Sequence, residues 1–108
     1  MPNFDHIGYA VRNVDEKKEL MEDLLGFKFN ERKEYVRSGV KSRLDFYEMP
    51  GGIMELVEVS DPGAAVNQFI DSRGEGIHHI CLRVDDICQT MEEWESKGVE
   101  FMVKPPRY

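Results

Sequence analysis

Two histidines and one carboxylate stand in separate apolar segments of the chain, and together they could bind a metal ion. His6 lies in FDHIGYAV, Glu55 in IMELVEV and His79 in GIHHICLRV. Alternate residues of a strand share a face, so Glu55 shares its face with Ile53 and Val57. Burying a carboxylate among such neighbours is costly unless it is paired or bound to a metal. Two imidazoles and a carboxylate suit zinc, iron, nickel, cobalt or manganese, and they leave coordination positions for water or substrate.

A metal-free interpretation of the same residues also stands, because the three are far apart in the sequence. The histidines could be packed or surface residues, and the glutamate could be solvated. His6 shares its face with Gly8 and Ala10, whose small size would leave room beside the imidazole. His78 faces the opposite way from His79, which favours a packing or hydrogen-bonding role for His78.

Other reactive side chains give weaker signals. Asp45 is a further carboxylate in a predicted strand, where it lies between Arg43 and Tyr47 and is flanked by Leu44 and Phe46. Cys81 is interpreted as a small core residue rather than a nucleophile. The sequence contains no Ser/His/Asp signature, no glycine-rich phosphate loop and no CxxC pair. The two histidines and Glu55 therefore remain the strongest candidates for chemistry.

Alternating and helical patterns predict the elements that position these residues. We expect strands over 4–14, 27–37, 38–49 and 53–59, with a hairpin turn at 50–52. A helix is expected from about residue 15 up to Gly26, because apolar residues recur there at helical spacing. These residues are Leu20, Met21, Leu24 and Leu25.

The later part of the chain predicts two more helices and two more strands. A helix is expected over 61–73, with Asp61 as its N-cap, followed by a strand over 78–84. Asp85 or Asp86 can cap a helix that runs to Gly98, and a strand is expected over 99–103.

The two halves of the chain repeat one pattern. Both have a strand that opens with histidine, then an acidic turn, an amphipathic helix, a glycine and another strand. We infer a duplicated β-α-β unit, which would bring both histidines to one metal. The matched pairs are His6 with His79, Ile7 with Ile80, and Val11 with Val84.

Length and composition indicate one small globular domain. The chain has 108 residues, of which 41% are hydrophobic and 32% charged, and its net charge of −7 argues against a nucleic-acid partner. The N-terminus lacks the features of a signal peptide, and no apolar run approaches the ~20 residues of a membrane helix. Cys81 and Cys88 are too few for a disulfide scaffold. We therefore expect a cytoplasmic protein.

These motifs resemble the vicinal oxygen chelate superfamily, which includes the glyoxalases and the bleomycin resistance proteins. Within it, GEGIHHI followed by VDDI is most similar to the methylmalonyl-CoA epimerases, with the glyoxalase I enzymes next. HIGYAV and DLLGF are shared more widely across the superfamily, and IMELVEV is also part of the resemblance. The resemblance covers nearly the whole chain, from Phe4 to Pro106.

The resemblance implies an α+β fold of paired βαβββ modules that form a cup around a divalent metal. Residues 1–60 would form the first module, 61–75 a helical connector and 76–108 an incomplete second module, within a single glyoxalase-like domain over 1–108. The metal ligands would be His6, Glu55 and His79, and Asp45 would be an acid/base. The family's last two strands, which carry a further glutamate, have no counterpart before Tyr108.

The chemistry implied is that of a methylmalonyl-CoA epimerase, in which a proton is abstracted next to a thioester carbonyl and the metal stabilises the enolate. A glyoxalase I-like lyase and a metal-free small-molecule binding protein are the alternatives, and a non-haem iron oxygenase uses the same ligand types. The substrate would be an acyl thioester or a hemithioacetal, and the metal cobalt, nickel, zinc, manganese or iron. An exposed sheet edge would favour a homodimer.

Overall fold

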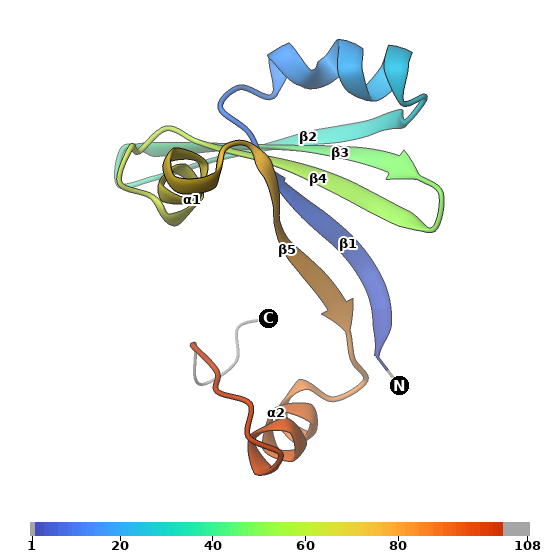
Figure 1. The fold of residues 1–108 in the computed structure, drawn as a ribbon, viewed down its shortest axis with the longest axis vertical. Coiled ribbons are helices and arrows are strands. Elements are labelled where there is room, and N and C mark those ends of the chain that lie inside the picture. The colour runs from blue at the N-terminus through green and yellow to red at the C-terminus, as the bar shows by residue number, and fades with distance from the viewer. Residues whose placement is uncertain (1, 103–108) are drawn as a thin grey trace. The chain divides into compact units, whose positions relative to one another are not determined.

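The computed structural model describes residues 2–102, which form a five-stranded sheet with helical segments (Figure 1). The fold class expected from the sequence is confirmed: this is the glyoxalase-like α+β arrangement. The elements in chain order are β1 (Asn3–Ala10), η1 (Asp15–Lys17), η2 (Leu20–Leu24), β2 (Lys28–Arg37), β3 (Val40–Met49), β4 (Gly52–Val59), α1 (Ala65–Arg73), β5 (Gly76–Arg83) and α2 (Ile87–Ser96).

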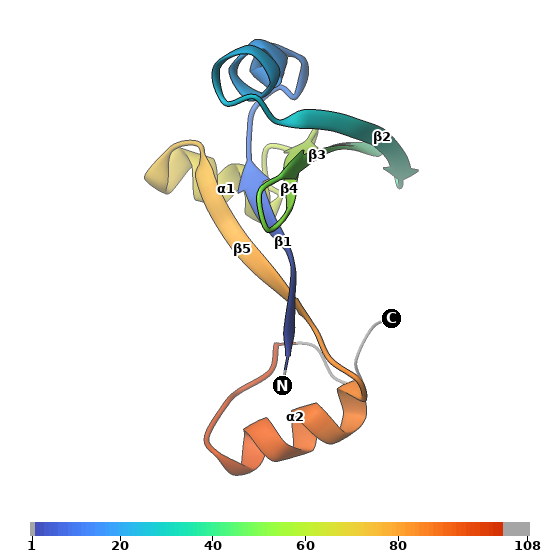
Figure 2. The same cartoon turned by 90° about the vertical axis from the view of Figure 1, so that its right-hand side faces the viewer.

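The order of strands in the sheet is β2-β3-β4-β1-β5. β3 pairs antiparallel with both β2 and β4, and β1 pairs with β4 in parallel (Figure 2). A parallel pair needs a crossover, which the helical segment between β1 and β2 begins. The first strand of the chain therefore lies inside the sheet, between β4 and β5.

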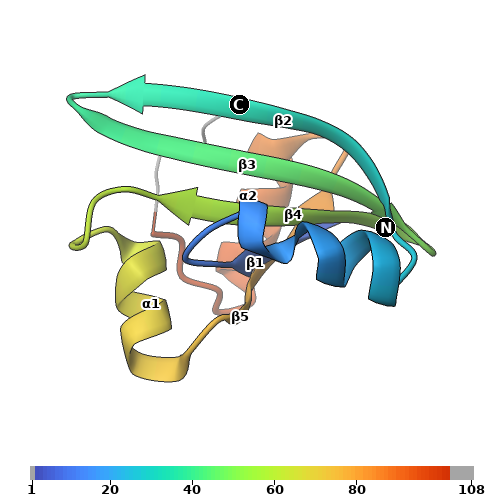
Figure 3. The ribbon, with the colours of Figure 1, turned by 90° about the horizontal axis from the view of Figure 1, so that it is seen from above.

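The main core lies between the sheet and the helical segment over residues 15–24 (Figure 3). Alternation along each strand sends one set of side chains to this face. The buried members of this cluster are Val11, Val14, Met21, Tyr47, Met54 and Leu56.

The first helical segment differs in type from the helix that the sequence predicts. It begins with the 3₁₀ turn η1 and continues as the π-helix η2, in which the Leu25 N–H donates to the Leu20 carbonyl, 3.0 Å away. A π-turn has more residues than an α-turn, so side chains after it no longer keep α-helical spacing. Met21 is buried as expected, but Leu24 is 74% exposed and Leu25 is also exposed.

Asp61 is not the N-cap of α1, contrary to the prediction. Its carboxylate accepts a hydrogen bond from the Gly63 N–H at 2.9 Å, and its carbonyl accepts one from the Ala64 N–H. Gly63 and Ala64 belong to this turn, so α1 begins only at Ala65. A capping side chain of the Asp type is confirmed at the other predicted helix, where Asp86 caps α2.

The contacts divide the chain into two units, residues 4–81 and residues 2–3 with 82–102. In the smaller unit Met91 is buried, and Trp94 stacks on Phe101 with ring centroids 6.5 Å apart. The strand predicted over 99–103 is not formed by residues 99–102, and its last residue lies outside the described part. No helix within residues 2–102 is long and apolar enough to cross a membrane.

Candidate metal centre

His6, Glu55 and His79 come together from three neighbouring strands, β1, β4 and β5. The Nε2 atom of His6 lies 3.7 Å from Glu55 Oε2, and the Nε2 atom of His79 lies 4.0 Å from Glu55 Oε1. The two imidazole rings meet edge to face with centroids 5.6 Å apart. The donor atoms of the three residues all lie within 4.8 Å of one another. The structure thus places the three predicted ligands in one cluster.

The strand order explains this convergence. In the parallel pairing of β1 with β4, Gly8 lies opposite Glu55 and His6 opposite Ile53, so His6 is offset by two residues from the carboxylate. Residues two apart share a face, which places His6 and Glu55 on the same side of the sheet. β5 borders β1 on its other edge and brings His79 to this side.

Gly8 provides the space that His79 occupies. A Cβ atom built at Gly8 would overlap the imidazole ring of His79. The small residue predicted to leave room beside His6 therefore makes room for the second histidine itself.

The cluster of His6, Glu55 and His79 is called the triad below. Asp5 does not belong to the triad, but it orients His6. The Oδ2 atom of Asp5 lies 2.8 Å from His6 Nδ1. A carboxylate only accepts, so the imidazole donates its Nδ1–H, and the lone pair of a neutral His6 is on Nε2, facing Glu55. Sequence analysis missed Asp5, because strict alternation places it on the opposite face. Its position directly before His6 is the only signal that the sequence carries.

His78 has the corresponding position next to His79. The two Nδ1 atoms lie 3.0 Å apart, and the His78 ring packs edge-on against Phe69 with centroids 5.1 Å apart. These contacts confirm the packing and hydrogen-bonding role expected of His78. They also leave His79 Nε2 directed at Glu55.

The protonation state of His79 suits a metal ligand. Partial burial lowers the pKa of His79, and the neighbouring His78 and His6 act in the same direction, whereas Glu55 opposes them. A lowered pKa keeps the imidazole neutral at pH 7, with its lone pair available. Glu55 is itself only 13% exposed, so its charge has little solvent around it.

Asp45 does not join this cluster, and its expected role as acid/base is not supported by its position. In the β3–β4 pairing it lies opposite the core residue Leu56, whereas Phe46 lies opposite Glu55, so Asp45 is on the other face of the sheet. Its carboxylate is 1% exposed and accepts two hydrogen bonds from Arg32, at 2.6 and 2.9 Å.

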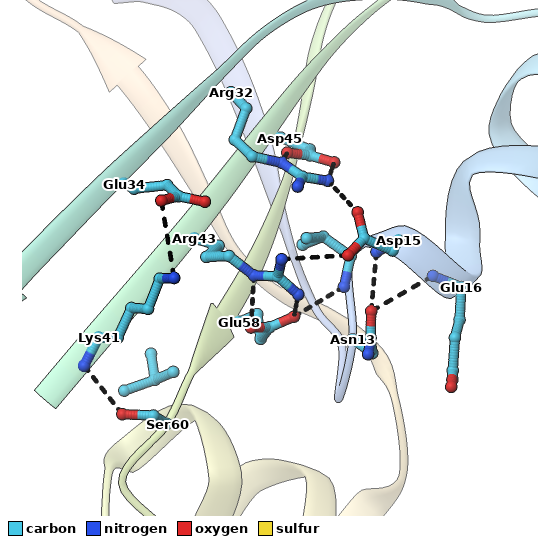
Figure 4. A network of polar contacts seen from close by, with 12 residues as sticks. Asn13, Asp15, Glu16, Arg32, Glu34, Lys41, Arg43, Asp45, Glu58 and Ser60 are labelled. Carbon is cyan, nitrogen blue, oxygen red and sulfur yellow. Dashed lines mark hydrogen bonds and ion pairs between the residues drawn. The ribbon is translucent and has the colours of Figure 1, made fainter.

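Arg32 and Asp45 belong to a structural ion network (Figure 4). Asp15 accepts from Arg32 at 2.5 Å and from Arg43 at 3.1 Å, and Arg43 donates to Glu58. This network ties the start of the first helical segment to β2, β3 and β4. It explains why a carboxylate is buried at Asp45 without a metal.

A match to a family's sequence profile identifies the family. The profile of the glyoxalase/bleomycin resistance protein/dioxygenase superfamily matches residues 5–108. The chain belongs to this superfamily. The resemblance seen in its motifs is therefore confirmed, and the mixed five-stranded sheet with its helices matches the glyoxalase-like fold.

Among relatives, the hemolysin VllY of Vibrio vulnificus is 42% identical over 121 residues, covering 96% of this chain and 30% of VllY. The chain therefore spans less than a third of that relative. Among solved structures, the hypothetical protein BH1468 from Bacillus halodurans superposes with a TM-score of 0.87 at 30% identity, covering 98% of this chain and 75% of that one.

Another similar structure is a Streptomyces coelicolor methylmalonyl-CoA epimerase variant in complex with 2-nitronate-propionyl-CoA. Its TM-score is 0.82 at 25% identity, and the match covers 97% of this chain and 76% of the epimerase.

The donor set of this superfamily member fits a divalent ion. Two imidazoles that direct Nε2 inwards and one carboxylate provide three ligands for zinc, cobalt, nickel, manganese or iron. Their ligand atoms lie within 4.8 Å of one another, close enough for the three side chains to share one ion.

Proposed function

We propose that the chain binds one divalent metal through His6, Glu55 and His79 and uses it in an epimerase reaction of the methylmalonyl-CoA type. The observation that carries this proposal is the convergence of both Nε2 atoms on Glu55. Similarity to the Streptomyces coelicolor epimerase, which was solved with an acyl-CoA analogue, supports the substrate class. When bound, the metal would polarise the thioester carbonyl and favour loss of the neighbouring proton.

The chain's own residues prepare this chemistry in three ways. Asp5 and His78 hold the two imidazoles with Nε2 towards the ion. Glu55 contributes the negative charge that offsets part of the cation's charge. The proposal assigns no proton transfer to Asp45, because its carboxylate is bound by Arg32 on the other face.

Metal retention in matched variants tests the site. We expect cobalt to remain near one equivalent after loading and desalting in the unchanged protein, and to be lost in Glu55→Gln and His79→Ala. Glu48→Gln, on exposed strand surface of β3, is the matched control and should retain cobalt. Retention by Glu55→Gln and His79→Ala, or no retention by the unchanged protein, would contradict the site.

Solvent exchange tests the reaction. With methylmalonyl-CoA in deuterated water, the cobalt-loaded protein should introduce deuterium at the carbon next to the thioester, and Glu55→Gln should not. Metal retention without exchange would reject the epimerase while leaving the metal site intact.

A dioxygenase is the second candidate, because two histidines and one carboxylate form the ligand set of many non-haem iron oxygenases. The superfamily itself includes dioxygenases. Oxygen consumption by the iron(II)-loaded protein with a candidate substrate would favour this candidate over proton exchange. A glyoxalase I-like lyase would instead act on a hemithioacetal, and a metal-free binding protein would hold its ligand equally well after chelation.

We also propose a homodimer that forms in a reducing compartment such as the cytoplasm. β5 is an edge strand in the order of the sheet, and its Ile77 and Ile80 are 58% and 61% exposed. Such an edge is suited to pairing with a second copy. Light scattering at micromolar concentration should give twice the mass of one chain, and a strictly monomeric species would refute the dimer.

A further inference from the structure

We propose that Asp5, His6 and Cys81 form a second, alternative ligand set for a thiophilic divalent cation such as cadmium or zinc. This site is distinct from the triad in two of its three ligands and shares His6 with it. The proposal goes beyond the epimerase reaction, because it concerns which metals the chain can hold and where.

The geometry places a mixed donor set at this point. Asp5 and His6 lie on β1, and Cys81 lies on the neighbouring strand β5. Their donor atoms all lie within 4.8 Å of one another, and all three residues are partly buried. Cys81 is two residues from His79 and therefore shares its face, next to the first site.

We assign His6 Nδ1 to the second set and Nε2 to the triad, because Asp5 lies beside the first nitrogen and Glu55 beside the other. Nδ1 lies 2.8 Å from Asp5, and Nε2 lies 3.7 Å from Glu55. An ion at Nε2 leaves the proton on Nδ1, where Asp5 accepts it. An ion at Nδ1 would move the proton to Nε2, where Glu55 can accept it. Each carboxylate is thus a ligand in one set and the hydrogen-bond partner of the imidazole in the other.

The thiol decides which metals prefer the second set. Thiolate ligands select soft or borderline cations, whereas manganese favours oxygen and nitrogen donors. Binding releases the thiol proton of Cys81 to solvent and forms the metal–sulfur bond, about 2.3 Å long for zinc. The ion would replace the Asp5–His6 hydrogen bond with bonds to both residues.

A neutral His6 cannot bind an ion in each of the two ligand sets at the same time. Simultaneous occupancy would require loss of the one N–H proton of neutral His6 to give an imidazolate, so one ion should exclude the other. The expected stoichiometry is one ion per chain, with manganese at the triad and cadmium at the thiol set.

A cadmium titration followed by ultraviolet absorption tests the second set. Thiolate-to-cadmium charge-transfer absorption should rise to one equivalent in the unchanged protein and in Cys88→Ser. It should be lost in Cys81→Ser. It should persist in His79→Ala, which lacks one ligand of the triad and keeps Asp5, His6 and Cys81. This variant separates failure of the second set from failure of the proposed epimerase site.

Three results would overturn the proposal: no absorption in the unchanged protein, absorption that persists in Cys81→Ser, or absorption that is lost in Cys88→Ser. Electron paramagnetic resonance tests exclusion, because cadmium should release bound manganese as the free ion. Manganese that stays bound would show that the sets are independent.

If Cys81→Ser does not fold, alkylation of the unchanged protein tests whether cadmium binds Cys81. Cadmium should protect Cys81 from iodoacetamide while the exposed Cys88 reacts at its usual rate. Equal reaction of Cys81 with and without cadmium would overturn the proposal.

Discussion

At the scale of single residues, the candidate metal centre depends on side chains that an ion bound by His6, Glu55 and His79 would not touch. Asp5 holds the Nδ1 proton of His6, and Gly8 leaves the volume that the His79 ring fills. Outer hydrogen bonds of this kind fix the tautomer and the orientation of ligating histidines. The two residues therefore provide separate tests of how the triad is assembled.

Replacing Asp5 by Asn should weaken metal binding at the triad by about 10- to 100-fold, since the charged acceptor on His6 Nδ1 is lost. Cobalt affinity from competition with a chelator measures the change. Asp71→Asn is a control of the same chemistry at an exposed carboxylate that pairs with Arg12. Equal affinity in Asp5→Asn and the unchanged protein would show that Asp5 does not orient the ligand.

Replacing Gly8 by Ala should abolish cobalt retention while leaving the fold in place. The new Cβ overlaps the imidazole of His79, and overpacking of this kind costs about 1–3 kcal/mol. Gly76→Ala is the matched control, because a Cβ there meets no atom within 4 Å. Undiminished cobalt in Gly8→Ala would mean that the ring can move aside without loss of the site.

At the scale of the elements, an ion network attaches the first helical segment to the sheet. Arg32, Arg43 and Glu58 come from β2, β3 and β4, and Asp15 accepts hydrogen bonds from both arginines. The Val14 N–H also donates to Glu58, at 2.9 Å. These contacts hold the segment over the core cluster that contains Met21.

Replacing Asp45 by Asn should lower the free energy of unfolding by about 1.5–3 kcal/mol, the usual contribution of hydrogen bonds to charged groups. Urea denaturation measures this loss, and cobalt retention should not change. Glu31→Gln, at an exposed ion pair of β2, should cost less than about 1 kcal/mol. Loss of cobalt in a folded Asp45→Asn variant would restore a role for Asp45 at the metal site.

The stability of the fold should fall at acid pH partly through Glu58. Burial alone would raise the pKa of Glu58, but hydrogen bonds from Arg43 and the Val14 N–H outweigh it and lower the pKa below its usual value. A lowered carboxyl pKa stabilises the fold above the unfolded pKa of about 4.5, and that contribution is lost as the pH falls through the folded value.

Urea midpoints from pH 7 down to pH 3 should therefore fall less steeply in Glu58→Gln than in the unchanged protein. Glu48→Gln serves as the control for loss of an exposed carboxylate. Identical slopes in Glu58→Gln and the unchanged protein would show that Glu58 does not contribute to acid unfolding.

At the scale of the whole molecule, the proposed ion would join strands from both repeated halves of the chain. His6 and Glu55 come from the first half and His79 from the second, all within the unit formed by residues 4–81. A ligand that binds only the folded state at 100 times its dissociation constant adds about 2.7 kcal/mol of stability.

Cobalt should therefore raise the Tm of the unchanged protein and leave that of His79→Ala unaltered, as calorimetry with and without the metal can measure. Since only the native strand order brings the three ligands together, the shift reports on the assembled sheet. A similar rise in both proteins would indicate binding elsewhere.

Most strands and the three main ligands could be predicted because they depend on local patterns. Local patterns identified all five strands, β1 to β5, and placed His6 and His79 at equivalent points of a repeat. Asp85 and Asp86 were both candidate caps because capping is a local contact within one turn, and the structure shows that Asp86 is the one used. The single-domain prediction over 1–108 remains a prediction.

The tertiary structure alone decided which of the candidate groups meet. Asp45 and Glu55 are both carboxylates within predicted strands, and the sequence does not distinguish their roles. The cross-strand register places Asp45 beside Arg32 and Glu55 beside the histidines. The same holds for the contact of Gly8 with His79, which depends on β5 lying beside β1. Periodicity tells which residues share a face of one strand, whereas long-range pairing determines which strands are neighbours and what their side chains touch.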